Sequence, residues 1–474
     1  MLLLLVLRSG GSTAAAEGIS AGCADLVVDC GAVPDDATDS AAAFYRCMAL
    51  ASQRSGCVTI PGGSYRISPV QFNQSNLEFT VANRAVFRPH SESSTGGGAL
   101  FTFGEHAPTS ANYITNVSLH GLAPGRFIVD VSEPLRKPWR VRAVAFAGIN
   151  GFALANVLAK MSPPDSRSEL PDGDGRSQWY DLPTRFLPPT TAFAAFPDQR
   201  LNFNTARAHS PAFSFDYSKF TDGESIVRLN PQGGVVSNIS STGAFAGYGL
   251  VQLRSGKDIR FKNLWGEGGV TLRLETGDDG RGYAGNISGS NITCVNGSSA
   301  FMAQPHCQAN GEFHVTDLVS IACNNAMHLS GGFVSLDKCC DNTTGTPSDC
   351  LPAGHYDNSS SISRVRAVYG TEAQVEDSSR TALPSCAACA IENAALNYNV
   401  RISDVQTVGF PPPSQRDACT FYRRCDGCYF ENGKSGRDYC KKPCGCPFYE
   451  QPDHPSLMPI KSDDTTLKGR GSSE

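Results

Sequence analysis

A short alternation of apolar and polar positions recurs along the chain. Its form is apolar–x–apolar–x–Asn/Asp–apolar, and it occurs at 152–157, 259–264, 313–318 and 400–405, with a poorer copy at 287–292. This alternation predicts a strand with one face inward, and Asn or Asp suits the turn that follows. A repeat of about 20–30 residues is typical of a β-solenoid. A β-sandwich with irregular loops is the alternative.

The segment 23–66 predicts a first coil and its cap. Residues 26–28 and 58–60 have the composition of short strands, and a helix over roughly 40–52 lies between them, with Asp39 as its cap. Such a helix would cover the open edge of the first coil, which a β-protein must protect. A disulfide between Cys47 and Cys57 could join the helix to the strand.

These features predict an all-β chain: a right-handed parallel β-helix with an N-terminal capping helix and a Cys-rich C-terminal module. The predicted divisions are a signal peptide at 1–22, the cap and first coil at 23–66, the β-helix at 67–410, the Cys-rich module at 411–454 and a disordered tail at 455–474. Within the β-helix, the Pro- and Ser-rich residues 162–212 predict a long excursion over one face.

Composition narrows the classes of function. The 474 residues carry a net charge of −5 and 18% charged side chains, so nothing points to nucleic acid. No run of 18 apolar residues predicts a membrane span. The apolar residues 1–7 lead into small residues at 14–16, as in a signal peptide, with a misassigned start as the alternative. A secreted, extracellular or cell-wall protein is expected, acting as a monomer.

Cysteines and glycosylation sequons support an oxidising compartment. The chain has 18 cysteines, and an even number in a secreted chain argues for disulfides. N-glycosylation sequons occur at Asn73, Asn116, Asn238, Asn286, Asn291, Asn296, Asn342 and Asn358. Zinc is the alternative for the last six cysteines, because Cys425 and Cys428 have ligand spacing. No cofactor is otherwise required, and a structural Ca²⁺ ion stays an option.

Three polar residues suggest a site. Gln252, Glu275 and His306 are separated by 23 and 31 residues, and each gap suits one coil. In a β-helix they would stand in register on one face of coils that stack ~4.8 Å apart. An amide, an acid and an imidazole together indicate acid–base chemistry on a carbohydrate. His306 alone would more often be structural.

Two arginines accompany these residues. Residues i and i+2 of a strand share a face, so Arg273 points the same way as Glu275, and Arg254 the same way as Gln252. The structural interpretation is a ladder of surface ion pairs. The functional one is an acid flanked by groups that bind sulfate or carboxylate. Burial would raise the pKa of Glu275, whereas Arg273 would lower it.

Several segments in fixed order resemble glycoside hydrolase family 82, the ι-carrageenases. They are GYGLVQ at 247–252, GGVTLRLET at 268–276, AFMAQPH at 300–306, NG at 310–311 and GGFV at 331–334. The resemblance implies a right-handed β-helix that cleaves β-1,4 bonds of sulfated galactans with inversion. Glu275 would then be the general acid, Gln252 would help place the attacking water, and His306 would bind substrate or tune the acid. Arg273 and Arg254 would meet sulfate groups.

The chain departs from the family pattern Glu-Thr-Asp at Gly277, the position of the expected general base. An inverting site needs two carboxyl groups ~6.5–9.5 Å apart. Asp279 would lie ~13 Å from Glu275 along a straight strand. The glycines at 277 and 280 permit a sharp turn that could bring Asp278 or Asp279 back toward Glu275. A solvated turn is the alternative for this aspartate pair.

Other functions stay open beside the hydrolase of sulfated galactans. A polygalacturonase-like hydrolase would share the strand–helix–strand opening, but its Asn-Thr-Asp and Arg-Ile-Lys motifs are missing. A Ca²⁺-dependent polysaccharide lyase is a further alternative. A catalytically impaired β-helix glycoprotein that binds cell-wall sulfated galactan is compatible with the loss of a carboxylate at Gly277.

Overall fold

The computed structural model describes residues 22–90, 98–104, 113–132, 142–161, 211–216, 218–222, 225–244, 249–276, 282–305, 308–323, 325–329, 354–368, 391–393, 398–408, 418–419, 459–460 and 466–467. The predicted signal peptide, nearly all of the 162–212 excursion and most of the Cys-rich module lie outside these residues. The proposed divisions of the chain therefore stay predictions.

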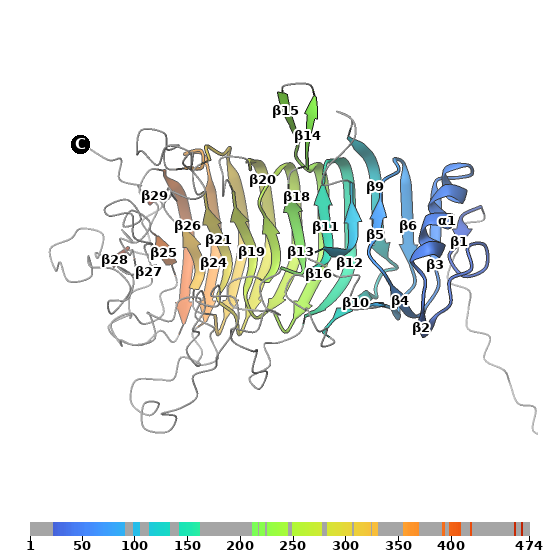
Figure 1. Ribbon diagram of the computed structural model, residues 1–474. Coiled ribbons are helices and arrows are strands. Elements are labelled where there is room, and N and C mark those ends of the chain that lie inside the picture. Colours follow the sequence, from blue (N-terminus) through green and yellow to red (C-terminus); the bar gives the residue numbers. More distant parts are fainter. Residues whose placement is uncertain are drawn as a thin grey trace, which may run out of the picture.

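Two long sheets run the length of the molecule and are built almost entirely from parallel strands (Figure 1). The main path of the first sheet follows the order β1 (Ala24–Asp25), β3 (Cys57–Ile60), β6 (Leu77–Val81), β9 (Ile114–Gly121), β12 (Ile149–Met161), β16 (Gln232–Thr242), β18 (Gly256–Glu267), β20 (Ala284–Val295), β22 (Phe313–Ile321), β24 (Ser361–Val368), β26 (Val400–Val408) and β29 (Thr466–Leu467). Off this path lie β2 (Asp35–Asp39), β4 (Gly63–Ile67), β7 (Ala85–Pro89) and β10 (Phe127–Val131).

The second sheet lies against the first. Its order is β5 (Val70–Phe72), β8 (Ala99–Phe103), β11 (Arg142–Ala147), β13 (Phe213–Asp216), β17 (Gly249–Leu253), β19 (Val270–Glu275), β21 (Ser299–Gln304), β23 (Asn325–Leu329), β25 (Ile391–Asn393), β27 (Ala418–Cys419) and β28 (Pro459–Ile460). A separate antiparallel pair, β14 (Ser218–Asp222) and β15 (Ser225–Leu229), projects from the stack in Figure 1.

This stack of coils confirms the predicted right-handed parallel β-helix. Successive coils place one strand in each sheet, and each strand pairs with its counterpart one coil later, as β18 does with β20 and β20 with β22. A β-sandwich is excluded, because its sheets would be antiparallel. No helix among the described residues is long and apolar enough to cross a membrane.

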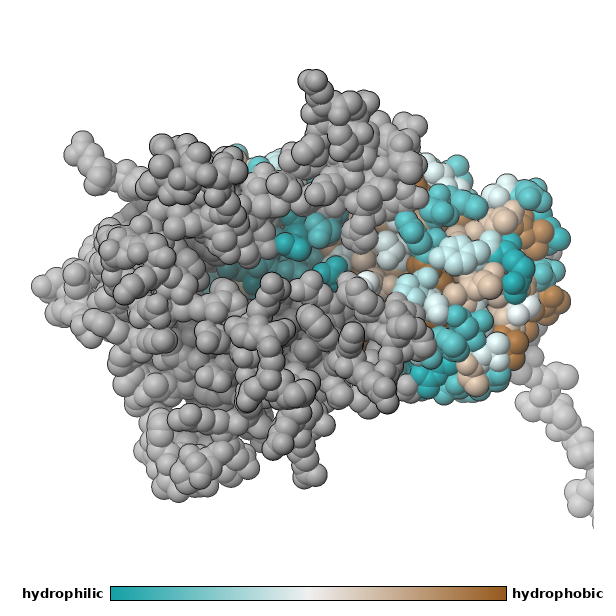
Figure 2. Space-filling model, in the orientation of Figure 1, coloured by the Kyte–Doolittle hydropathy of each residue, from teal (hydrophilic) through white to brown (hydrophobic). Residues whose placement is uncertain are grey.

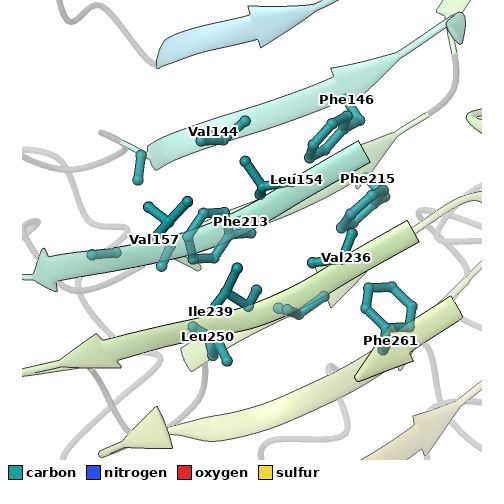
Figure 3. Packing of buried hydrophobic residues seen from close by; sticks show 14 of the residues in the cluster. Val144, Phe146, Leu154, Val157, Phe213, Phe215, Val236, Ile239, Leu250 and Phe261 are labelled. Atoms are coloured by element: carbon teal, nitrogen blue, oxygen red, sulfur yellow. The ribbon is translucent and has the colours of Figure 1, made fainter. Parts of the chain in front are cut away.

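Apolar side chains from each coil stack in the interior between the sheets (Figure 3). Phe146 and Phe215 lie nearly parallel, with ring centroids 4.6 Å apart, and Phe215 meets Phe261 edge-on at 5.5 Å. All three rings are buried. Burying one such side chain contributes roughly 1.5–3 kcal/mol, so the inward positions of the repeat supply most of the driving force for coiling.

The Asn and Asp positions of the repeat form a ladder at one corner. Asn156, Asn238, Asn263 and Asn291 have positive φ angles of 53–59°, a conformation that Asn tolerates better than most residues. Asn238, Asn263 and Asn291 each donate Nδ2–H to Oδ1 of the preceding asparagine, at 3.1, 2.6 and 2.9 Å along the series, and Asn156 donates to the Gly121 carbonyl oxygen at 2.7 Å. The corner lies within continuous strands, so it is a bend and not the separate turn that the sequence suggested. Two of these asparagines, 238 and 291, belong to sequons, and their amide groups serve the fold.

Helix α1 (Ala41–Ser52) covers the first coil, as predicted. The N-cap residue is Ser40, and the Asp39 carboxylate accepts a hydrogen bond from the Ala41 backbone N–H at 3.0 Å. The expected Cys47–Cys57 disulfide is wrong. The disulfides are Cys23–Cys57 and Cys30–Cys47, because the strand and turn before the helix lie closer to each partner. A third, Cys294–Cys323, joins neighbouring coils.

The surface near this cap is mixed in character. Figure 2 shows apolar and polar patches side by side over the N-terminal coils. Val28, Val33 and Tyr45 are large apolar residues that stay exposed there.

Candidate active site

Three adjacent strands of the second sheet, β17, β19 and β21, carry the candidate site. Their inward residues are apolar and belong to the core: Val251, Leu253, Leu272, Leu274, Phe301 and Ala303. Successive residues of a strand alternate between faces. Gln252, Arg273, Glu275 and Gln304 therefore point outward, on one face of three consecutive coils.

The register of these strands corrects one prediction. Gln252 is paired with Arg273, and Glu275 is paired with Gln304, so Gln252 and Glu275 do not stand directly opposite each other. They are offset by two positions, which keeps them on the same face. The coil is shorter than expected because Gly268 and Gly269 form a tight turn with φ angles of 79° and 63° just before β19.

The offset still brings the predicted side chains into contact. Gln252 Nε2 donates a hydrogen bond to Glu275 Oε2. Arg273 Nε lies 3.0 Å from the same oxygen and forms an ion pair with it. Arg273 Nη2 also donates to Oε1 of Gln304, at 3.0 Å. An amide, a carboxylate, a guanidinium and a second amide thus form one connected cluster.

This cluster is largely shielded from water. Gln252, Arg273 and Glu275 are 5%, 6% and 8% exposed, respectively, and Gln304 is half-buried. The structural interpretation of a solvated surface ion pair is therefore wrong for Arg273 and Glu275. A charged pair removed from water persists only when each charge is matched, and here each partner has a second polar contact.

Arg254 lies further along the same face and is more exposed. Its Nη1 is 3.6 Å from Asp216 Oδ2, an ion pair with the preceding strand of the sheet, β13. Sequence reasoning missed Asp216. The alternation Phe213, Ser214, Phe215 places it at the end of a strand, but nothing in the sequence shows which coil lies next to Arg254.

A buried tyrosine supports the site from inside. Tyr356 donates its hydroxyl hydrogen to the Leu274 carbonyl oxygen at 3.1 Å. Burial raises the pKa of Tyr356, and the nearby Glu275 charge raises it further. Tyr356 therefore stays protonated and holds the end of β19 next to Glu275. Its distance from Glu275 in the sequence hid it from sequence reasoning.

The remaining predicted site residues, Asp278, Asp279 and His306, lie outside the described residues, as does Gly277. Their roles stay predictions. Among the described residues, no group of three or more His, Cys, Asp or Glu side chains could hold a metal ion. The structural Ca²⁺ ion stays a prediction.

Comparison with known proteins gives two curated relatives. An iota-carrageenase of Alteromonas macleodii is 26% identical over 322 residues, which is 66% of this chain and 53% of the relative. An iota-carrageenase of Zobellia galactanivorans is 24% identical over 326 residues, 68% of this chain and 55% of the relative. The chain resembles the iota-carrageenases. It spans about half the length of these relatives, and no protein-family profile matches it.

Solved structures agree on the fold. An iota-carrageenase complexed to iota-carrageenan fragments superposes with a TM-score of 0.61 at 20% identity, covering 82% of this chain and 88% of that one. A family 82 iota-carrageenase from A. fortis gives a TM-score of 0.60 at 19% identity, covering 84% and 88%. These structures support the fold, and the two curated relatives confirm the resemblance to iota-carrageenases that the motifs indicated.

Proposed function

We propose that the chain is a glycoside hydrolase that cleaves β-1,4 linkages of a sulfated, carrageenan-type galactan with inversion. The observation that carries the proposal is the contact of Gln252, Arg273 and Glu275 on one face of stacked coils. The similarity to two curated iota-carrageenases supports the substrate class.

In the proposed reaction Glu275 is the general acid. Gln252 and Arg273 both contact its Oε2, and in this proposal the transferable proton is carried by Oε1. That proton passes to the glycosidic oxygen as the bond to the anomeric carbon breaks. A water molecule attacks the opposite side of the sugar and loses its proton to a base, for which Asp278 and Asp279 are the candidates.

Gln252 can orient that water. Its Nε2 is committed to Glu275, which leaves its Oε1 as an acceptor for a water or hydroxyl hydrogen. His306 would bind substrate or tune the acid, and Arg254 would meet a sulfate group, as the resemblance implies.

Secretion to the cell wall fits the same proposal. Three disulfides are present among the described residues, and disulfides persist in oxidising compartments. A polysaccharide substrate would also be met outside the cell.

A second function, binding of sulfated galactan without cleavage, is favoured by one observation. Gly277 replaces the family's base, and in this state Arg273 is paired with the candidate acid. Release of reducing ends from ι-, κ- and λ-carrageenan and from pectate tests both functions. The hydrolase is expected to lose cleavage, and keep binding, in Glu275→Gln. Binding with no cleavage by the unaltered chain would refute the hydrolase.

The general base is tested separately. Asp278→Asn and Asp279→Asn should differ, because one turn conformation can bring only one of the two carboxylates near the attacking water. The variant that loses cleavage while retaining binding identifies the base. Full activity in both variants would remove the two aspartates from the mechanism.

A further inference from the structure

Gln304 lies directly beside the candidate acid on the next coil. It is the last residue of β21 and pairs in register with Glu275. Its backbone carbonyl oxygen accepts a hydrogen bond from Thr276 N at 3.1 Å. Paired strands are ~4.8 Å apart, so the Gln304 side chain lies within reach of a sugar bound at Glu275.

The orientation of the Gln304 amide is set by Arg273. Because Oε1 accepts a hydrogen bond from Arg273 Nη2, the two hydrogens on Nε2 point away from the arginine. No acceptor for them lies among the described residues. Gln252 has the opposite arrangement, since its Nε2 donates to Glu275. The two amides therefore offer an acceptor on one side of Glu275 and donors on the other.

Arg273 itself is poorly placed to bind substrate. Its guanidinium is engaged at both ends, by Glu275 and by Gln304, and the residue is only 6% exposed. Gln304 is more exposed than Arg273. A ligand that reaches this face meets the Gln304 amide before it meets the arginine.

We propose that Gln304 determines specificity by donating its amide hydrogens to a sulfate or hydroxyl oxygen of the sugar bound beside Glu275. Arg273 then orients the Glu275 and Gln304 side chains, both of which it contacts. This inference rests on the proposed function, because it assigns the sugar to that same site.

Two variants separate substrate contact from anchoring. Gln304→Glu keeps an acceptor for Arg273 but replaces the amide donors by a carboxylate oxygen, which repels a sulfate group. Gln304→Met removes the hydrogen bond from Arg273 and the proposed hydrogen bonds to the sugar, while keeping the side-chain length. The matched control is Gln406→Glu, the same chemical change at an exposed position of β26 in the other sheet. Urea midpoints for all three variants check that the fold persists.

The expected result is a rise of at least tenfold in KM for sulfated galactan in both Gln304 variants, larger for Gln304→Glu, with kcat within twofold. Gln406→Glu should match the unaltered chain. A fall in kcat at unchanged KM would show that Gln304 acts only through Arg273, and would overturn the proposal. Unchanged kinetics would also overturn it. Repeating the measurement on chemically desulfated galactan identifies the contacted oxygen: the effect disappears for a sulfate and persists for a hydroxyl.

Calorimetric binding of a sulfated galactan oligosaccharide distinguishes the failure of this proposal from that of the hydrolase. If the unaltered chain binds without cleaving, the hydrolase fails, and at least tenfold weaker binding by both Gln304 variants still supports the donor role. If the unaltered chain cleaves and the Gln304 variants bind as tightly as it does, only the donor role fails. An unaltered chain that neither binds nor cleaves overturns both.

Discussion

Replacing Arg273 by Met would leave the Glu275 carboxylate in a shielded site without its positive partner. The two side chains are 7% and 10% exposed and 3.0 Å apart. Removing one partner of a buried ion pair costs about 3–5 kcal/mol. Glu275 keeps the hydrogen bond from Gln252, so the loss at pH 7 should lie near the lower end, about 3 kcal/mol.

The destabilisation caused by Arg273→Met has an upper limit that depends on pH, because the Glu275 carboxyl group of the variant can bind a proton instead. Protonating a glutamate whose unfolded-state pKa is about 4.3 costs about 1.4 kcal/mol for each pH unit above that value. The ceiling is therefore about 4 kcal/mol at pH 7 and about 1 kcal/mol at pH 5. The destabilisation caused by Arg273→Met should shrink as the pH falls, because the variant's folded state then takes up the proton at little cost.

Urea unfolding followed by circular dichroism at pH 5 and pH 7 measures this difference. The double variant Arg273→Met/Glu275→Gln is the control, since it has no carboxyl group to titrate at this site. Its stability relative to the unaltered chain should change little between the two pH values. Equal destabilisation of Arg273→Met at pH 5 and pH 7 would refute the claim that a shielded carboxylate is left without its partner.

Three further predictions concern the scaffold. Asn263→Ala should lower the unfolding free energy by about 2–3 kcal/mol, because it removes two ladder hydrogen bonds at a positive φ. Glycine tolerates that φ, so Asn263→Gly should lower the unfolding free energy clearly less. Equal urea midpoints for the two variants would contradict this. The hydrogen bond from Arg364 holds the pKa of Asp317 at about 2, so the pair stabilises the fold above pH 3.8 and this stabilisation is lost as the pH falls toward 2. The pair is about half exposed, which limits its contribution to the unfolding free energy to below about 1 kcal/mol. Asp317→Asn should abolish this part of the acid dependence of stability between pH 2 and 5. Gly268→Ala would place a Cβ 2.3 Å from the Ala244 carbonyl oxygen at a φ of 79°. This should lower the unfolding free energy by about 1–3 kcal/mol and reduce cleavage by shifting β19. Unaltered cleavage with unaltered stability would argue that this turn does not position β19.

Local chemistry made the coil predictable from the sequence. Alternation identified the inward residues, and the Asn or Asp of each repeat occupies a corner with positive φ, because those side chains tolerate that conformation and can bond their copies on neighbouring coils. The contact between Gln252 and Glu275 could be predicted for a related reason. Two residues that share a face and lie on neighbouring coils meet even when the register differs by two positions.

Features that depend on the path between strands could not be predicted. The exact register follows from the tightness of the Gly268–Gly269 turn, and disulfide partners follow from how α1 folds over the first coil. Tyr356 and Asp216 reach the site from other coils, and no local pattern specifies which coil that is. Gln304 could have been found by counting the register forward from Glu275, once that register was known.

Whether the offset between β17 and β19 is an odd or an even number of residues decides whether Glu275 can point outward and form an active site on this face. A slip of one residue between β17 and β19 would turn the Glu275 carboxylate into the apolar core and bring Leu274 out. A slip of two, which is the offset found, keeps the acid outward and changes only which neighbours it contacts. Glu275 then stands opposite Gln304 and diagonally from Gln252, so one amide reaches it as a donor while the other is turned by Arg273 to face outward. The arrangement of hydrogen-bond donors and acceptors around Glu275 therefore depends on the length of the coil between β17 and β19. An insertion of two residues in the 254–268 segment should disturb the cluster of polar side chains while leaving the hydrophobic core in place.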